Sequence, residues 1–125
     1  YNDSTVRTSA VRSLGELGCK DDKVIDALVV ATTDDIGNVR SHAAESLGLL
    51  GNTSDKAVDA LIESLTDCYW YVRMNAAESL GKLGCKDDKV INALINRLNN
   101  DNELLVSEAA TEALGKLRVV LGKSS

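Results

Sequence analysis

Residues 72–84, VRMNAAESLGKLG, decide the fold, because copies of this stretch recur along the chain. The copies begin at Val6 (VRTSAVRSLGELG), at Val39 (VRSHAAESLGLLG) and, in a more divergent form, at Val106 (VSEAATEALGKLR). The leading valines are 33, 33 and 34 residues apart. Such a regular period predicts a repeat protein, which buries its core between successive repeats instead of around one centre.

The composition narrows the classes of partner. Hydrophobic residues make up 44% of the 125 residues, yet there is no Phe, one Trp and three Tyr, so aliphatic side chains must form the core. The formal net charge of −5 disfavours nucleic acid and anionic membranes as partners. No apolar run approaches the roughly 20 residues that span a bilayer. The chain begins at Tyr1 instead of Met, so we expect it to be part of a longer protein.

The three cysteines predict neither a disulfide nor a metal site. Cys19 and Cys85 occupy equivalent places two periods apart. Packed helical layers about 10 Å apart would separate them by roughly 20 Å, which is beyond disulfide reach. Cys68 matches neither of them. We expect reduced structural thiols, a cytoplasmic protein and no cofactor, with a reactive or paired thiol as the alternative.

Apolar residues within each copy follow the spacing of an amphipathic helix, as at Val39, Ala43, Leu47 and Leu50. A second helical pattern lies between the copies, so two helix types alternate. Residues that favour helix ends separate them, namely Gly18, Gly51 and Gly84 after one type and Asp21, Ser54 and Asp87 before the other. The pattern predicts helices and no strand, with helices near residues 4–17, 22–32, 37–50, 55–66, 70–83, 88–99 and 103–120.

Each copy also carries a glycine inside its predicted helix, at Gly15, Gly48, Gly81 and Gly115. A glycine there costs about 1 kcal/mol of helix stability relative to alanine. Because the cost recurs, we predict that an adjacent helix approaches closely at these positions.

The pattern D-x-x-x-x-V-R-x-x-A-A-x-x-L-G-x-L-G, from Asp67 to Gly84, resembles HEAT-like repeats of the short type named for phycobilin lyase subunits. The preceding Asp-Lys-x-Val/Ile-x-Ala-Leu-Ile segment is similar to the first helix of that repeat. The likeness covers essentially the whole chain. It implies an all-α, right-handed α-solenoid of antiparallel helix pairs, in which the Val-Arg helices line the concave face.

On this basis the chain, residues 1–125, is one array of about 3.5 repeats. It should consist of an inner helix at 4–17 followed by helix pairs at 22–50, 55–83 and 88–120. The first helix lacks an outer partner, so Val6, Ala10, Val11 and Leu14 should be incompletely covered. We expect weak self-association through this open N-terminal end.

A periodic set of charged residues predicts a structural ladder. Asp34 and Arg40 recur one period later as Asp67 and Arg73, and Arg7 lies in register before them. We expect each aspartate to cap its helix and to pair with an arginine of its own or of the neighbouring repeat. The alternative is that the arginines bind an anion. The paired aspartates would oppose this, because they would already neutralise the arginines' positive charge.

The sequence predicts a protein that is not an enzyme. His42 is the only histidine, and no Ser-His-Asp or Cys-His set is evident. The resemblance extends to metal hydroxylases built on HEAT-like repeats, but these need several His-Glu pairs, and Ala43 follows His42. We therefore predict no metal site.

Positions that vary between copies, while the scaffold stays constant, mark the candidate binding surface. Trp70, Tyr71 and Met74 concentrate aromatic and methionine side chains in one repeat, and such residues are enriched in interface hot spots. Trp70 either covers the seam between helices or anchors a partner, and we favour the anchor. The predicted concave-face site consists of Trp70, Tyr71, Met74, Asn75, Glu78, Asn38, Ser41, His42, Glu45, Ser9 and Arg12.

The leading hypothesis is a scaffold or adaptor module that binds a protein or peptide on its concave face. The alternative is a non-catalytic or partner-dependent subunit of a phycobilin lyase-like enzyme, which rests on the resemblance alone. A DNA glycosylase built on HEAT-like repeats would need a basic concave face. Arg12 is the only basic residue expected to point outward on that face in the first three inner helices.

Overall fold

The computed structural model describes residues 3–118, which form seven α-helices and no strand. This confirms the predicted all-α repeat fold. The helices are α1 (Ser4–Leu17), α2 (Asp22–Ala31), α3 (Gly37–Leu50), α4 (Asp55–Ser64), α5 (Trp70–Leu83), α6 (Asp88–Asn100) and α7 (Leu104–Lys116).

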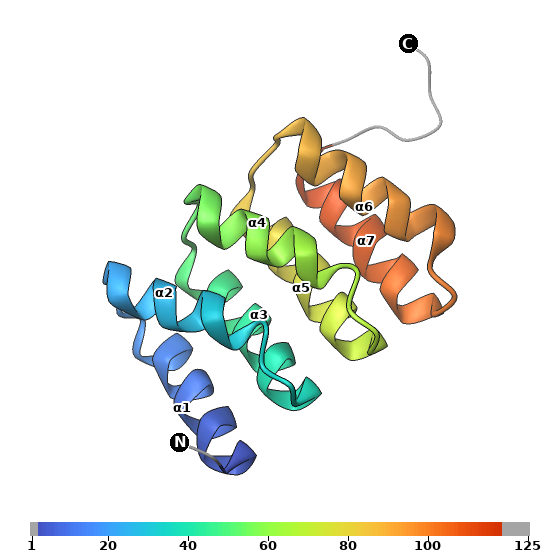
Figure 1. Ribbon diagram of the computed structural model, residues 1–125. Helices are drawn as coiled ribbons and strands as arrows, with labels where there is room; N and C mark the ends of the chain where they lie inside the picture. Colours follow the sequence, from blue (N-terminus) through green and yellow to red (C-terminus); the bar gives the residue numbers. More distant parts are fainter. Residues whose placement is uncertain (1–2, 119–125) are drawn as a thin grey trace.

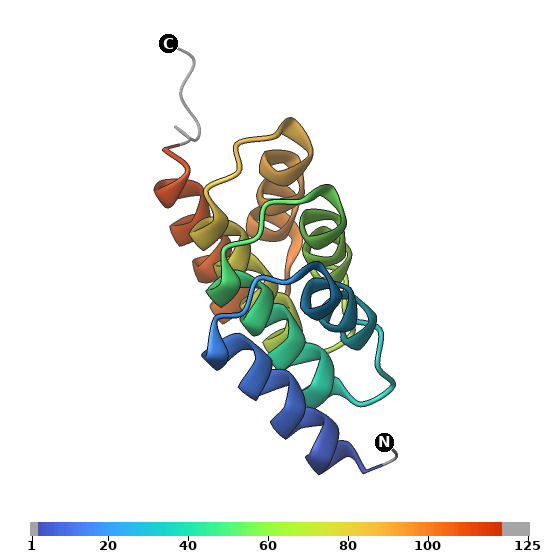
Figure 2. The same ribbon diagram turned by 90° about the vertical axis from the view of Figure 1, so that its left-hand side faces the viewer.

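The helices form two layers (Figure 1). Helices α1, α3, α5 and α7 lie side by side in one layer, which we call the inner layer, and α2, α4 and α6 form the outer layer. Figure 2 shows the same two layers after a quarter turn. Neighbouring helices pack extensively within the inner layer, whereas those of the outer layer touch each other sparsely. The inner helices therefore set the spacing of the repeats.

The largest difference from the predicted boundaries is at the last helix. It was expected to reach residue 120, but α7 ends at Lys116. The amide of Arg118 donates to the carbonyl of Gly115, and Arg118 has a φ of 61°, which closes the helix. Residues 119 and 120 lie outside the described residues.

Helices α2 and α4 end slightly earlier than predicted, at Ala31 and Ser64. The hydroxyl groups of Thr32 and Thr66 donate to the carbonyls of Val29 and Glu63, respectively. Such side-chain bonds to the backbone compete with continuation of the helix.

Most of the predicted helix caps are present. Asp21 and Ser54 accept hydrogen bonds from backbone amides in the first turns of α2 and α4. Asp87 occupies the same position before α6, but its side chain makes no capping bond. The inner helices α1, α3 and α5 end at Gly18, Gly51 and Gly84, with φ of 71°, 67° and 70°, a left-handed conformation that favours glycine.

An aliphatic core lies between the layers, as the composition predicts. Its largest fully buried side chains include Ile25, Leu28, Leu47, Leu61 and Leu80. Fully burying one such side chain contributes about 1.5–3 kcal/mol, so the repeats are held together mainly by aliphatic burial.

Three of the four in-helix glycines lie at close helix contacts. A Cβ atom added at Gly15 or Gly48 would lie 2.7 Å from the Cβ of Ser46 or Ser79, and one at Gly81 would lie 2.9 Å from the Cα of Ala113. The prediction is therefore correct for these positions. It is wrong for Gly115, where an added Cβ meets nothing within 4 Å, because no described helix packs beyond α7.

The serines that face these glycines bind the neighbouring helix. Ser46 Oγ donates to the carbonyl of Val11 at 2.9 Å, and Ser79 Oγ donates to that of Ala44 at 2.7 Å. Both hydroxyls are buried, so each bond satisfies a polar group that close packing has removed from water.

The N-terminal end is partly open, as expected. Val6 and Ala10 of α1 are exposed and Leu14 is half-buried. Val11 is only 7% exposed and belongs to the core, so the expectation that it is uncovered was wrong.

Candidate protein-binding surface

A ladder of ion pairs crosses the boundaries between repeats near the start of each inner helix. The Nε atoms of the arginines bond the Oδ2 atoms of aspartates one repeat further on: Arg7 to Asp34 at 2.8 Å, Arg40 to Asp67 at 2.7 Å and Arg73 to Asp101 at 2.8 Å. The arginine of each of the two central repeats also donates to a backbone carbonyl in its own repeat, Arg40 to Asp34 and Arg73 to Asp67. The ladder therefore fixes both the loop and the stacking of repeats.

The aspartates are not helix N-caps, contrary to the prediction. Asp34, Asp67 and Asp101 accept from the backbone amide two residues further on, at 2.9, 3.0 and 2.9 Å. The amides belong to the N-cap residues Ile36, Tyr69 and Glu103, whose own side chains make no capping bond. Each aspartate therefore closes a turn before its helix.

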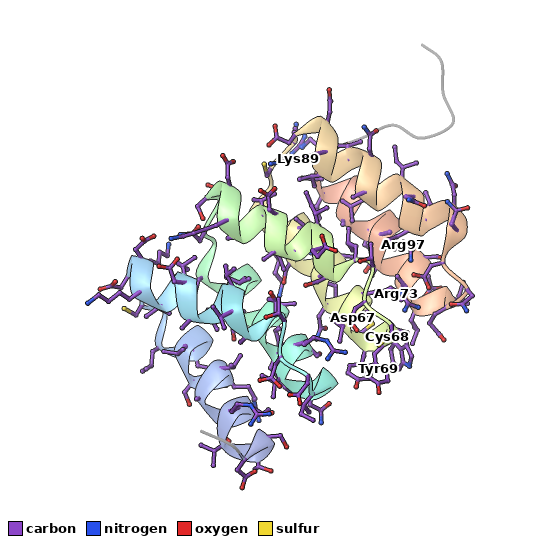
Figure 3. All side chains as sticks on the ribbon, in the orientation of Figure 1. Asp67, Cys68, Tyr69, Arg73, Lys89 and Arg97 are labelled. Atoms are coloured by element: carbon purple, nitrogen blue, oxygen red, sulfur yellow. The ribbon has the colours of Figure 1, made fainter. Side chains whose placement is uncertain are left out.

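Asp101 is a ladder residue that the sequence analysis missed. Its side chain is 0% exposed and also accepts from Arg97 at 3.1 Å, so two arginines share it. Arg73 comes from α5 and Arg97 from α6, and both are labelled in Figure 3. The 34-residue step from Asp67 was a usable signal, because the last copy is offset by the same extra residue.

The ladder holds the pKa values of its carboxyl groups below their ordinary range. Burial alone would raise the pKa of Asp101, but hydrogen bonds from Arg73 and the amide of Glu103, with the nearby positive charges, lower it. The pKa values of Asp34 and Asp67 are lowered in the same way, against burial, by Arg7 and Arg40. All three groups are therefore ionised at neutral pH. The arginines they occupy are poor candidates for the alternative anion site.

We expect acid to weaken the array as the pH falls below about 4. Between the lowered folded pKa values and the ordinary value of about 3.9, the unfolded chain binds more protons than the folded chain. The stabilisation that these ionised aspartates provide is therefore complete above their ordinary pKa. It is lost as the pH falls through their pKa values in the folded protein. Thermal unfolding from neutral pH to about pH 2 measures this loss. The stability of Asp101→Asn should fall less steeply with decreasing pH than that of the wild type. Parallel curves for the two proteins would exclude Asp101 as a contributor.

Three aromatic rings form a cluster where α5 begins. Tyr69 and Tyr71 are stacked, with ring centroids 5.4 Å apart and planes at 14°. Trp70 meets Tyr71 edge-on, with centroids 5.8 Å apart and planes at 87°. Trp70 is 39% exposed and Tyr69 is also exposed, so the cluster presents apolar surface to solvent. In Figure 3, Asp67, Cys68 and Tyr69 mark the loop that leads into this cluster.

Neighbouring residues hold the cluster in place. A Cβ atom added at Gly37 would lie 2.6 Å from the hydroxyl oxygen of Tyr71 and 2.7 Å from a ring carbon of Tyr69, so only glycine leaves room for the two rings. The guanidinium carbon of Arg40 lies 5.6 Å from the centre of the Tyr69 ring, within cation–π range. Because Arg40 is itself fixed by Asp67, the ladder supports the aromatic cluster.

The other predicted surface residues divide into exposed and packed groups. Ser41 is only 6% exposed, and the side-chain amide of Asn75 donates to its carbonyl and hydroxyl oxygens, so this pair connects α3 to α5. Ser41 therefore has little surface left for a partner. His42, Tyr71, Met74 and Asn75 are half-buried, and the exposed members are Ser9, Arg12, Asn38, Glu45, Trp70 and Glu78.

Two shallow hollows lie between α1 and α3. One, of about 250 Å³, is lined by Ser9, Arg12 and Asn38 among others. The other, of about 220 Å³, includes Arg12, His42 and Glu45, and His42 Nδ1 lies 3.3 Å from Glu45 Oε1. The structure thus brings together the predicted residues of the first two inner helices, and Asn75 of α5 joins them through Ser41. Trp70 and Tyr71 belong to the aromatic cluster at the start of α5.

A second set of ion pairs, not predicted from the sequence, connects the outer helices. Lys56 Nζ lies 2.7 Å from Asp22 and 2.6 Å from Asp26, and Lys89 Nζ lies 2.9 Å from Asp59. Each lysine reaches back to the preceding repeat, opposite to the direction of the inner ladder. The recurrence of Lys23, Lys56 and Lys89 at 33-residue steps was the available signal.

The described residues hold little that suggests another kind of site. Across residues 3–118, no group of three or more His, Cys, Asp and Glu side chains is arranged to hold a metal ion. The three cysteines are unpaired, and Cys19 and Cys68 are exposed. None of the helices in the described part of the chain has both the length and the apolar character needed to cross a bilayer.

The fold and the periodic contacts define an α-solenoid of stacked helix pairs. A family model described as HEAT repeats matches residues 2–80 and again residues 37–115. The chain belongs to the HEAT repeat family, which confirms the resemblance inferred from the sequence. A comparison with curated protein sequences gave no significant match.

Solved structures support this assignment. A chain in the complex of CpcE and CpcF of phycocyanin lyase from Nostoc sp. PCC7120 is 32% identical, with a TM-score of 0.82, and the match covers 94% of this chain and 49% of that one. An engineered protein is 27% identical, with a TM-score of 0.69 and coverage of 93% and 59%. A second engineered protein, at 23% identity, a TM-score of 0.61 and coverage of 94% and 58%, shares the fold. This chain therefore spans about half to three-fifths of each of these chains.

Proposed function

We propose that this HEAT repeat array is a protein-interaction module that binds a protein or peptide segment on the inner layer, around Trp70. The observation that carries the proposal is the exposed aromatic cluster at the start of α5, which Gly37 and Arg40 hold in place. A rigid aromatic anchor loses little conformational entropy on binding, so it favours affinity.

Exposed apolar side chains recur at the start of the next inner helix. Leu104 and Leu105 at the start of α7 are both exposed, and Leu104 is the equivalent of Trp70 one period later. Packed helices are about 8–10 Å apart, so a bound segment would meet apolar anchors at that spacing. Core packing does not require these side chains, which favours an interaction role.

The inner layer also carries an acidic row. Glu45, Glu78 and Glu112 occupy equivalent positions in α3, α5 and α7, and all three are exposed. Negative charge beside an apolar edge complements a segment that combines aromatic or aliphatic side chains with Lys or Arg. We therefore propose a partner of that composition.

Selection from a displayed peptide library tests the proposal without a known partner. We expect enriched peptides to combine apolar and basic residues. Trp70→Ala should weaken binding of a selected synthetic peptide by about 2 kcal/mol, roughly 30-fold, because the main anchor is lost. Isothermal titration calorimetry with each variant gives the affinity.

Leu17→Ala is a matched control, because it also truncates an exposed apolar side chain but lies at the far end of α1. It should leave peptide binding unchanged. Trp70→Ala should lower the free energy of unfolding by less than about 1.5 kcal/mol, the largest contribution expected from the edge-on contact between Trp70 and Tyr71. Equal affinity of the wild type and Trp70→Ala for every selected peptide would contradict the proposal, as would failure to enrich any peptide.

A second candidate function is that of a subunit of a phycobilin lyase-like enzyme. The 32% identity to a chain of the CpcE and CpcF complex favours it, and that complex shows one member of this fold working with a partner chain. A phycobilin titrated into this chain, alone and with a CpcF-type partner, should then change its absorbance spectrum. An unchanged spectrum in both mixtures would count against this function.

A further inference from the structure

A hollow of about 450 Å³ lies in the outer layer, between α2 and α4. Its walls include Val29 and Thr32 of α2 and Ala60 of α4, and Asp67 of the inner ladder also lines it. None of the three residues of the aromatic cluster lines this hollow. It is therefore a feature separate from the surface around Trp70, and its size is typical of ligand pockets.

The hollow is acidic. Asp59, Glu63 and Asp67 line it, together with one basic residue, Lys56. Lys56 is already held by two aspartates of the preceding repeat, at 2.7 and 2.6 Å. Glu63 is exposed and forms no ion pair with any residue from 3 to 118. The charges of the hollow therefore favour a cationic group that can reach Glu63 and Asp67.

The next repeat has an arginine of its own at the equivalent place. Arg97 of α6 corresponds to Ser64 of α4, one period earlier. Arg97 Nη1 donates to Asp101 Oδ2 at 3.1 Å, the same oxygen that accepts the ladder bond from Arg73 Nε. Figure 3 labels Arg97 together with Asp67, the ladder aspartate of the preceding repeat. A ladder aspartate in this protein can therefore accept a second arginine from the outer layer.

Asp67 lacks such a second arginine. Its Oδ2 accepts from Arg40 Nε at 2.7 Å, and its side chain keeps 10% of its surface exposed. Ser64 does not reach it, because the Ser64 hydroxyl donates to the carbonyl of Ala60 at 2.9 Å. The place that an arginine of the chain fills in one repeat is thus available to an external group in the other.

The charges around the two places differ in the direction that this comparison predicts. Asp59 and Glu63 line the hollow, whereas the next repeat has Asn92 and Asn96 at the equivalent positions. The repeat that supplies its own arginine has neutral side chains there, and the repeat that lacks one has carboxylates. Negative charge is therefore concentrated where a cation is missing.

A guanidinium group suits this hollow better than an ammonium group. It is planar and weakly hydrated and carries five N–H donors in a fixed fork, so it can bond Asp67 and Glu63 together. The methylene groups of an arginine side chain also pack on apolar surface, which Val29 and Ala60 provide here.

We propose that the hollow between α2 and α4 binds an arginine side chain of a partner protein, whose guanidinium bonds Asp67 as Arg97 bonds Asp101. The contact lies in the outer layer, so it is a docking point additional to the peptide site proposed around Trp70. The occupant is a residue within a protein segment, because the free carboxylate of the amino acid itself would be repelled by the acidic walls.

Titration of the ¹⁵N-labelled protein with N-acetyl-arginine amide, followed by the amide chemical shifts, tests the proposal. We expect saturable shifts at Thr33, Ala60, Glu63 and Thr66, with the millimolar affinity of a single side chain. N-acetyl-lysine amide should bind at least about fivefold more weakly. Free L-arginine should also bind more weakly, and a capped pentapeptide with a central arginine should bind at least as tightly.

Three results of this titration overturn the proposal. The first is the absence of saturable shifts at the hollow. The second is equal binding of the lysine derivative, which would indicate attraction of any cation. The third is tighter binding of free L-arginine than of its capped form, which would indicate a site for a small molecule instead of a protein segment.

Two variants test the place of binding. Ser64→Arg supplies the missing side chain from within the chain, so it should fill the hollow and abolish the shifts. Glu63→Gln removes a carboxylate outside the ladder and should weaken binding about two- to fivefold. Glu16→Gln is the matched control, because it changes an exposed glutamate of α1 and should bind as the wild type does.

Circular dichroism checks that each variant keeps its helices. Wild-type affinity in a folded Ser64→Arg protein would show that the probe binds elsewhere. Should Ser64→Arg fail to fold, Glu63→Gln decides, and an affinity equal to that of the wild type overturns the proposal.

Discussion

Replacing Asp101 with alanine should lower the free energy of unfolding by about 3–5 kcal/mol. The Asp101 side chain is 0% exposed, and Arg73, which pairs with it, is 10% exposed. Removing the carboxylate leaves Arg73 and Arg97 without their charge partner, and the amide of Glu103 loses its acceptor. The main cost is the buried arginine left without a counter-charge, because the surrounding packing prevents water from solvating it. Urea unfolding followed by circular dichroism gives the change.

Asp34→Ala is the matched control at the other end of the same ladder. Asp34 makes the same kinds of bond, but its partner Arg7 is 24% exposed and also lies 3.7 Å from Asp35, so Arg7 keeps contact with water and with a second carboxylate when Asp34 is removed. Asp34→Ala should therefore cost clearly less than Asp101→Ala. An equal loss in the two variants would show that burial of the pair does not set its contribution.

Replacing Gly48 with leucine should destabilise the array by about 3 kcal/mol, the upper part of the usual range for overpacking. The first added carbon would already lie 2.7 Å from the Cβ of Ser79 and 2.9 Å from its Cα. Because the second atom belongs to the backbone, α3 and α5 must move apart to relieve the contact. Their separation would also strain the buried bond from Ser79 to the carbonyl of Ala44.

Gly115→Leu makes the same change at the equivalent position in the last repeat. No atom lies within 4 Å of the added Cβ, so we expect a neutral or stabilising effect of up to about 1 kcal/mol from improved helix propensity. Thermal unfolding at low protein concentration compares the two variants as monomers. Equal destabilisation of both would mean that loss of glycine itself, and not the approach of the next helix, causes the effect.

Much of this architecture follows from local sequence. The 3.6-residue apolar spacing places all seven helices, and glycines with positive φ at Gly18, Gly51 and Gly84 end three of the inner helices. These features depend on residues within a few turns of one another, so a regular repeat reveals them. The exposed position of Trp70 was also accessible from sequence, because its equivalents Gly37 and Leu104 differ too much in size to form a constant packing contact.

Only the tertiary structure decided how the repeats meet. The sequence placed aspartates and arginines at a regular period, but the stacking register selects Asp67 for Arg40 and buries Asp101 between two arginines. The same register buries Ser41 under Asn75 and leaves Gly115 open, although the local sequence around each resembles that of its equivalents. These contacts join residues roughly one repeat apart, so they depend on which neighbour is present and how closely it packs. Gly115 therefore has the sequence of a packed position, but no described helix packs against it.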